Sequence, residues 1–470
     1  MLSGSVFELG HSDEALLGEL IQVYEAKRKR NALRSVYYDG KQALQDFGVS
    51  IPPAIRSQAE TTLEWVKTGV HALTDRSVFE GFVAPDEGDD PFGLAELLDA
   101  NSFGAEFDQA KVSSAQHACS FLTVSHGDAA SGEPDVLILP RAADESAALW
   151  DYRRRGLRGF LSVVSRDETG MPDGLIFYSP EHVTTVERRD GRLVVADRRR
   201  NPLGRVTVAP LTLRPELKRP FGHSRITRAA MYYTDAAMRT LLRAEGQAEI
   251  YNAPETWVLG ADQAAFGTDR WKAVMGRLKV ISRDEDGEVP EVHRFNGASP
   301  QPHIDQLRMW ASLFAGDQGL ALSSLGIVQD NPSSAEAIYA AKEDLIIDTQ
   351  KANESWGRGA VLAARLALEL RDGVEPGQAF RLSAQFTDPA RVSPTAAADA
   401  FAKRASVIPG FAESEVGLES AGLTREQIIR FQSERRRLGV SDLVARISER
   451  ADAGRSVEGV VDALAERGQD

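Results

Sequence analysis

The stretch that decides the fold runs from Pro332 to Gly373 and reads PSSAEAIYAAKEDLIIDTQKANESWGRGAVLAARLALELRDG. Ser333 and Glu336 are spaced as a capping box that starts a helix. Small and apolar residues then recur every three or four positions: Ile338, Ala341, Leu345, Ala352, Trp356, Ala360, Ala363, Ala367 and Leu370. Asp372-Gly373 ends the pattern. A helix over 333–371 would be roughly 55 Å long, which is typical of an element packed within a larger assembly.

The segment before this helix, Leu320 to Asn331, is small, polar and contains glycine, so it predicts a loop. No Lys or Arg occurs from Leu320 to Ala341.

Between 118 and 213 the pattern changes to short β-rich segments. These are Phe121 to Val124, Val136 to Leu139, Phe160 to Val164, Leu175 to Tyr178, Val183 to Glu187, Leu193 to Ala196 and Val206 to Leu213. Asp190-Gly191 predicts a hairpin turn between two of them.

The rest of the chain is mostly helical in pattern. Ser12 or Asp13 can cap a first helix that ends in Lys27-Arg28-Lys29-Arg30, and further helices are expected at about 57–75, 226–248 and 302–315. A mixed segment at 255–299 contains strand-like stretches at 256–259, 278–282 and 289–295. From 387 onward the chain is helical and rich in alanine, with breaks near Pro409-Gly410 and at 422–424. The sequence therefore predicts an α+β protein.

Composition narrows the function. Acidic residues outnumber basic ones 69 to 55, a net charge of −14. This argues against a protein that grips duplex DNA through phosphate contacts, but not against one that surrounds DNA and lets it slide. The single cysteine, Cys119, lies in an apolar run and is expected to be a small buried residue. We see no signal peptide or spanning segment and expect a soluble protein made in the cytoplasm.

The sequence contains no Walker A loop, dinucleotide fingerprint, zinc-protease motif, paired Cys-x-x-Cys or nucleophile elbow. We therefore predict no catalytic residues, no cofactor and no metal. Between 84 and 110 eight acids occur without a Lys or Arg, and Asp86, Asp89 and Asp90 are a conceivable hard-cation site, although they lack the ligand alternation of an EF-hand loop. The basic runs at 27–30, 153–155 and 198–200 fit an interface or nucleic acid, and we favour plain solvated surface.

The order of several motifs resembles one family. Tyr37-Tyr38-Asp39-Gly40 precedes Val49-Ser50-Ile51-Pro52-Pro53, and the later motifs are 201–206, Pro210-Leu211, 219–224 and 325–338. From about 14 to 430, this order is similar to the portal proteins of long-tailed phages, especially those of actinobacterial phages.

The resemblance implies a portal fold. Its parts would be a mixed α/β wing (1–222), a stem helix (223–251), a small α/β clip (252–300), a second stem helix (301–319), a tunnel loop (320–332), a long helix with a return to the wing (333–387) and a helical crown (388–470).

The resemblance also implies a dodecameric ring at one capsid vertex, through which double-stranded DNA is packaged and ejected. Its partners would be terminase, a head–tail adaptor, the major capsid and scaffold proteins and no membrane; the subunit would be assembled in the host cytoplasm and located in the virion. Two sets of residues are expected to serve these roles. The tunnel loop offers Ser323, Ser324, Gln329, Asp330, Asn331 and Ser333, and the clip offers Arg270, Lys272, Arg277 and Lys279 for docking. An uncharged lining suits transport because each strong phosphate contact adds a barrier to sliding.

Two alternatives stay open. One is a metal-dependent nuclease built on the acids at 86–90. The other is a different ring component such as a head–tail adaptor, in which the long helix at 333–371 has no place.

Overall fold

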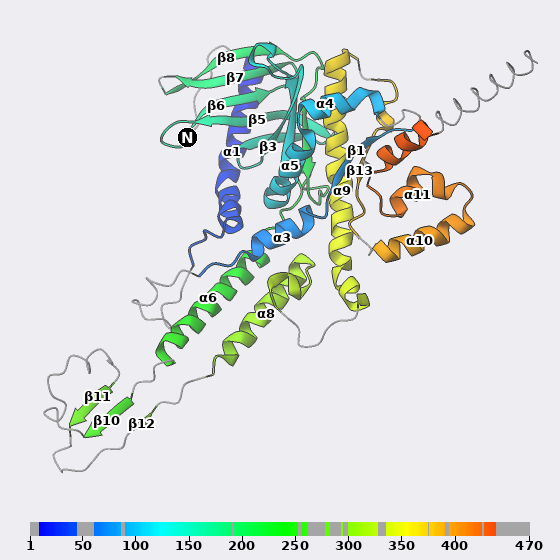
Figure 1. The fold of residues 1–470 in the computed structure, drawn as a ribbon. Coiled ribbons are helices and arrows are strands. Elements are labelled where there is room, and N and C mark those ends of the chain that lie inside the picture. The colour runs from blue at the N-terminus through cyan, green and yellow to red at the C-terminus, as the bar shows by residue number, and fades with distance from the viewer. Residues whose placement is uncertain are drawn as a thin grey trace, which may run out of the picture. The chain divides into compact units, whose positions relative to one another are not determined.

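We describe the fold from a computed structural model, which covers residues 9–44, 61–85, 90–189, 191–251, 256–260, 278–282, 293–294, 299–327, 335–374, 376–390, 394–424 and 427–438. The chain divides into two compact units, Met1–Pro389 and Ala390–Asp470. Figure 1 shows helices combined with antiparallel sheets, and the α+β class predicted from the sequence is confirmed.

The centre of the first unit is a pair of antiparallel sheets. Strands β4 (Ser146–Asp151), β5 (Gly156–Arg166), β6 (Pro172–Tyr178), β7 (His182–Arg189) and β8 (Arg192–Arg200) form a meander, and β2 (Cys119–His126) lies between β3 (Val136–Ala142) and β9 (Val208–Thr212). Alternate side chains point to opposite faces of a strand, so neighbouring residues serve different layers. Phe121, Phe160 and Tyr178 share one cluster between the sheets, with the Phe121 and Phe160 ring centroids 4.8 Å apart.

Helices cover the outer faces of both sheets. Helix α1 (His11–Tyr38) packs Leu17 and Leu20 against the meander, where they meet Leu161 and Phe177. Helices α5 (Phe103–His117) and α9 (Ala335–Asp372) cover the three-stranded sheet. Strand β9 lies so close to α9 that a Cβ atom at Gly359 would meet the Pro210 carbonyl oxygen at 2.6 Å. The long helix predicted from the sequence is confirmed, and its 38 residues span about 57 Å.

Shorter elements complete the first unit. Helix α3 (Trp65–Thr74) packs on α5, β1 (Phe79–Val83) pairs with β13 (Ser383–Phe386), and the turn η1 (Pro91–Gly93) leads into α4 (Leu94–Ala100). The turn η5 (Ala379–Arg381) precedes β13, and η2 (Ala129–Ser131) joins β2 to β3.

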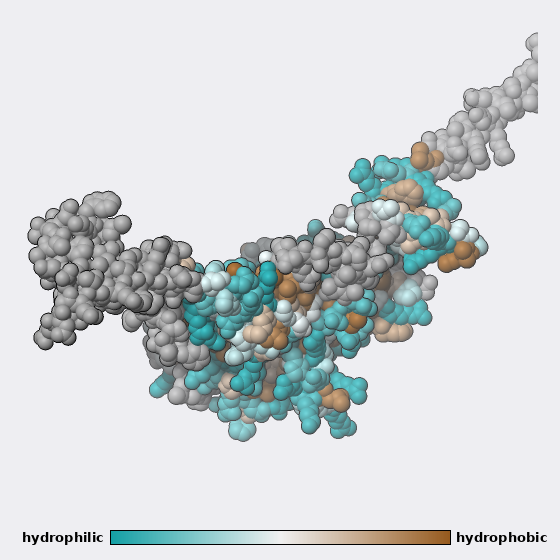
Figure 2. All heavy atoms as spheres, turned by 90° about the horizontal axis from the view of Figure 1, so that it is seen from below, coloured by the Kyte–Doolittle hydropathy of each residue, from teal (hydrophilic) through white to brown (hydrophobic). Residues whose placement is uncertain are grey.

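Two further helices, α6 (Arg228–Tyr251) and α8 (Gln301–Gln318), pack against each other, with the Tyr233 and Trp310 rings stacked at 6.4 Å. Between them in sequence, β10 (Thr256–Gly260) pairs in parallel with β11 (Leu278–Ser282) and antiparallel with β12 (His293–Arg294). Seen from below, the surface is mostly hydrophilic and carries separate hydrophobic patches (Figure 2). None of the helices described here is both long and apolar enough to cross a membrane.

The second unit holds α10 (Pro394–Val407), the turn η6 (Phe411–Glu413) and α11 (Glu415–Ser420), which contact one another. The predicted breaks near Pro409-Gly410 and Gly422 are confirmed, since Gly410 and Gly422 have positive φ angles of 77° and 90°. The names wing, stem, clip and crown stay predictions.

Some sequence predictions about elements were wrong. Helix α1 does not end at Lys27–Arg30 but continues to Tyr38, and Gly10, not Ser12 or Asp13, is its N-cap. Strands β1, β4 and β13 were not predicted, and the helix expected at 57–75 begins only at Trp65. Of the strand expected at 289–295, His293–Arg294 forms β12, and the remainder lies outside the described residues. The strands predicted at 121–124, 136–139, 160–164, 175–178, 183–187 and 193–196 and the hairpin between β7 and β8 are confirmed, and the strand predicted at 206–213 narrows to β9.

Candidate DNA-channel segment and subunit surfaces

The predicted channel segment begins where α8 ends. Gly319 closes α8 in the left-handed conformation, with φ 60°, and the Leu320 amide donates back to the Ala315 carbonyl at 2.8 Å. A turn of 3-10 helix, η4 (Leu322–Leu325), follows, so this part is not the plain loop predicted from the sequence. Its two serines, Ser323 and Ser324, are exposed. The other predicted residues, Gln329, Asp330, Asn331 and Ser333, lie outside the described residues.

Hydrophobic contacts hold the turn η4 in place. Leu322, Leu325 and Ile327 pack against the main core, and η4 contacts α3 and α8. This packing fixes the backbone that carries Ser323 and Ser324, and both exposed side chains are uncharged.

A buried arginine ties the elements around this segment together. The Arg225 guanidinium donates to the Gly69 carbonyl of α3 at 2.6 Å and to the Gln318 carbonyl of α8 at 2.5 Å. It also lies 3.7 Å from the Asp348 carboxylate of α9. Burial lowers the pKa of Arg225 to about 10. Sequence reasoning missed this residue, because nothing local distinguishes a buried arginine from the surface arginines around it.

Helix α9 is held to the sheet by further polar contacts. The Ser355 hydroxyl donates to the Thr212 carbonyl at 2.6 Å, and the Trp356 indole donates to the Ser114 hydroxyl at 2.9 Å. Trp356 has no exposed surface. Helix α9, which follows the predicted channel segment, is therefore part of the core of the first unit.

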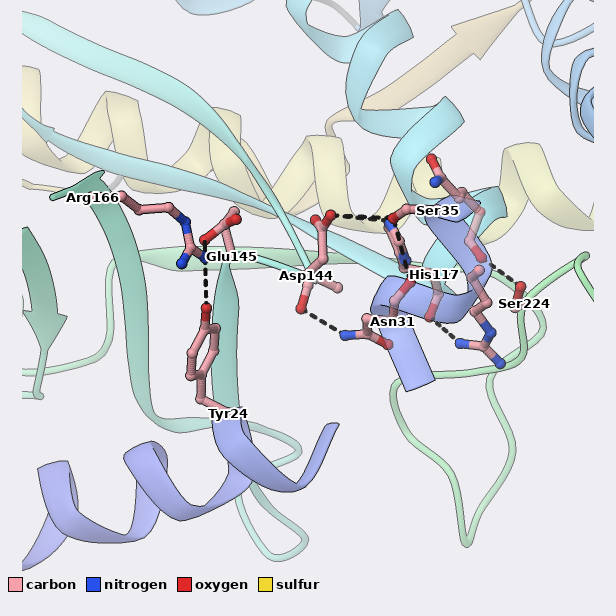
Figure 3. Close-up of polar contacts among 11 residues, drawn as sticks. Tyr24, Asn31, Ser35, His117, Asp144, Glu145, Arg166 and Ser224 are labelled. Carbon is pink, nitrogen blue, oxygen red and sulfur yellow. Dashed lines mark hydrogen bonds and ion pairs between the residues drawn. The ribbon is translucent and has the colours of Figure 1, made fainter. Parts of the chain in front are cut away.

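Helix α1 is fastened to the strands by polar contacts (Figure 3). The Arg166 guanidinium donates to the Tyr24 hydroxyl at 2.9 Å and to the Glu145 carboxylate at 2.5 Å. Farther along the helix, the Asn31 amide donates to the Ala143 carbonyl at 2.9 Å.

The last turns of α1 reach the end of α5. The Arg34 guanidinium donates to the His117 carbonyl at 2.8 Å, and the Ser35 hydroxyl lies 3.5 Å from the Asp144 carboxylate. The His117 Nε2 atom is 3.6 Å from Asp144, while its buried Nδ1 atom has no partner. Burial lowers the pKa of His117, against the smaller opposing effect of Asp144.

The basic runs differ in how they are paired. Arg198 and Arg199 pair with Asp13 and Asp197 at 2.7 and 2.8 Å. By contrast, no carboxylate of the described chain forms an ion pair with Lys27 or Arg30. The run at 153–155 occupies the turn between β4 and β5.

The structure describes only one of the four predicted clip residues. Lys279 belongs to β11, opposite Trp257 of β10, whereas Arg270, Lys272 and Arg277 lie outside the described residues.

The residues considered for metal binding or nucleophilic chemistry, Asp90 and Cys119, have structural roles in the described chain. Asp90 accepts a hydrogen bond from the Ala95 amide at 2.9 Å, and Asp86 and Asp89 lie outside the described residues. Within the described residues no group of three or more His, Cys, Asp or Glu side chains could hold a metal ion. Cys119 is buried as predicted, and burial raises the pKa of its thiol to about 12, which favours the neutral thiol over the thiolate.

The described chain thus combines two stacked sheets, a long core helix and a pair of packed helices, α6 and α8. The chain is similar to the portal protein of Mycobacterium phage D29, with 26% identity over 436 residues that cover 90% of this chain and 89% of the relative. It is also similar to the portal protein of Mycobacterium phage L5, with 26% identity over 398 residues, 82% of this chain and 80% of the relative. The resemblance to actinobacteriophage portal proteins predicted from the sequence is confirmed.

Other comparisons add less. No family model matches the chain. Among solved structures, a chain in the neck of a native GTA particle aligns with a TM-score of 0.42 and 12% identity, covering 80% of this chain and 95% of that one. A chain in the neck of an empty GTA particle aligns with the same TM-score and identity over 76% and 90%.

Proposed function

We propose that this chain is the portal subunit of a long-tailed phage. About twelve copies form a ring at one capsid vertex of the virion, and double-stranded DNA is packaged and ejected through it. The observation that carries the proposal is the similarity to two portal proteins over nearly the full length of both partners, up to 90% of this chain and 89% of the relative.

The ring is tested by electron microscopy of the purified protein. Rings of about twelve subunits with a central hole are expected. Protein that stays monomeric, with or without other head proteins, would refute the proposal.

We place the channel lining at the segment after α8. Ser323 and Ser324 are exposed and uncharged, which supports weak contact with phosphates and free sliding. Shortening the segment Leu325 to Asp330 should leave rings intact but impair packaging or retention of DNA. Full genome content at normal virion yield would contradict this placement.

A substitution gives a sharper test of the same segment. Ser323→Arg combined with Ser324→Arg should preserve rings but lower the DNA content of particles, since each new cation adds a phosphate contact. The matched control is the pair Ser323→Ala and Ser324→Ala, which should package as wild type does. Equal packaging by both pairs would remove η4 from the channel.

We propose the clip as the docking surface for terminase and the head–tail adaptor. Reversing the charge of Arg270, Lys272, Arg277 and Lys279 should abolish binding of terminase to purified rings. The control is reversal of Arg153 and Arg154 in the β4–β5 turn, which should leave binding unchanged. The major capsid and scaffold proteins complete the expected partners, with assembly in the host cytoplasm.

The subunit is proposed to carry no catalytic activity. Asp90, the described member of the acid cluster, already accepts a backbone amide hydrogen bond. Magnesium-dependent cleavage of plasmid DNA that is lost in Asp89→Ala would instead establish the nuclease alternative.

A further inference from the structure

A basic cavity lies beside α1. Its volume is about 670 Å³, and its walls come from α1, β4 and the segment 218–223. Five cations line it, and no Asp or Glu does: Lys27, Arg30, Arg34, Lys218 and Arg219. This grouping is unexpected in a chain with 69 acidic and 55 basic residues.

These cations lack counter-charges within the described part of the chain. Lys27, Arg30 and Arg34 recur on one face of α1, and none of them forms an ion pair with a described carboxylate. Arg34 is satisfied only through the His117 carbonyl, and Arg219 through a ring nitrogen of His223 at 3.3 Å. Burial and the nearby charge of Arg30 lower the pKa of Arg34 to about 10. The cavity wall itself is therefore positively charged.

Aromatic side chains complete the cavity wall. Trp150 and Phe221 meet edge to face at 5.9 Å, and Tyr152 stands 66% exposed beside them. Tyr, Trp and Arg are the residues enriched at the energetic centres of protein interfaces. A cavity of this volume admits a few side chains and is too small to seat a duplex. The walls thus fit an acidic protein segment.

The chain carries such a segment on its other side. Asp90 precedes η1, and Glu96 and Asp99 lie on α4; all three are exposed. Among the described residues none of them forms a direct ion pair, although the charges of Asp90 and Glu96 help to raise the pKa of the nearby Arg371. Figure 1 shows α1 and α4 at opposite sides of the first unit, with α5 between them. A ring needs two different, complementary surfaces on opposite sides of each subunit, because its contacts are head to tail.

We propose that the basic cavity of one subunit receives the acidic α4 segment, Asp90 to Asp99, of the neighbouring copy in the ring. This inference rests on the proposed function. It adds to that function the two surfaces of the first unit through which neighbouring subunits would join.

Two charge-reversed variants test the interface. Variant one carries Lys27→Glu and Arg30→Glu, and variant two carries Glu96→Lys and Asp99→Lys. Each variant alone places like charges at every contact, so the protein concentration needed for ring formation should rise more than about tenfold. An equimolar mixture restores opposite charges at every contact and should form rings as wild type does, with the two variants alternating. Ring formation is measured by sedimentation velocity and electron microscopy.

A control separates local charge from total charge. Arg153→Glu with Arg154→Glu changes the net charge equally on an exposed turn and should leave assembly unchanged. Rescue in the mixture also shows that both variants fold.

The outcomes are distinct. Normal rings from both variants alone, or no rescue in the mixture, would overturn the interface. Normal rings with reduced DNA retention in variant one would overturn it too, and would assign the cavity to nucleic acid. Wild-type protein that stays monomeric would refute the proposed function and this interface with it.

Discussion

Loss of the Arg225 guanidinium should destabilise the first unit strongly. Its side chain is 6% exposed, and it donates hydrogen bonds to the Gly69 and Gln318 carbonyls at 2.6 and 2.5 Å. Arg225→Met keeps most of the volume but removes both donors and the buried positive charge near Asp348. Removing one partner of a buried charged network costs about 3–5 kcal/mol of unfolding free energy.

A matched control shares the same carboxylate. Arg214 pairs with the same oxygen of Asp348 at 2.5 Å, yet its side chain is 55% exposed. Arg214→Met should therefore cost only about 0–1 kcal/mol, as exposed ion pairs do.

Thermal unfolding of the purified variants provides the assay. At about 2 cal/mol/K of unfolding entropy per residue, a loss of about 4 kcal/mol in the unit Met1–Pro389 lowers Tm by about 5 °C. Arg214→Met should lower Tm by about 1 °C at most. Equal, small shifts for both variants would refute the reasoning that Arg225 is the buried tie between α3, α8 and α9.

Two further predictions concern the backbone and pH. Gly222→Ala should lower the free energy of unfolding by well over about 2 kcal/mol, because the new Cβ would meet the Leu213 carbonyl oxygen at 2.0 Å at a φ of +72°. The control Gly170→Ala has a similar φ of +77° but open space around the Cβ, and should cost about 1 kcal/mol. Urea unfolding of the two variants measures the difference. Burial lowers the pKa of His117, so the folded state binds fewer protons there than the unfolded state, and stability falls as pH drops through the unfolded value of 6.5. His117→Gln should make unfolding less dependent on pH between 7 and 5, where one proton contributes at most about 1.4 kcal/mol per pH unit; an unchanged slope would show that His117 does not titrate on unfolding.

The elements that could be predicted are those whose pattern is local. Helix α9 repeats small and apolar residues with helical spacing over its whole length, and most central strands alternate or run apolar between turn residues. Strand β4, Ser146–Asp151, was missed because its serine and two alanines have low strand propensity. It becomes a strand through its pairing with β5, which the sequence does not display.

The end of α1 was predicted wrongly for a related reason. Lys27 to Arg30 resemble a helix end because cations favour the C-terminus of the helix dipole. The helix instead continues to Tyr38, and its last turns are held by Asn31 on the Ala143 carbonyl and Arg34 on the His117 carbonyl. Both acceptors are distant in sequence, so no local rule could identify them.

The site was predictable in part. The exposed serines of η4 follow from a polar stretch without cations, whereas its anchoring by Leu322 and Leu325 depends on the core. The basic cavity combines residues of α1 with the segment 218–223, and each part taken alone is typical of solvated surface. Such a combination becomes visible only when the fold brings the two segments together.

The separation of charge explains how a strongly acidic subunit can assemble with copies of itself. A net charge of −14 opposes self-association in general. A two-fold dimer that joins cavity to cavity, or α4 to α4, would add like-charge contacts to this repulsion. Because α1, which lines the cavity, and α4 lie at opposite sides of the first unit (Figure 1), one two-fold axis cannot join each surface to its complement. A head-to-tail contact can, and it leaves one cavity and one α4 segment free until the ring closes. The proposed interface would therefore select a closed ring over a dimer by electrostatics, before any stem or channel contact is made.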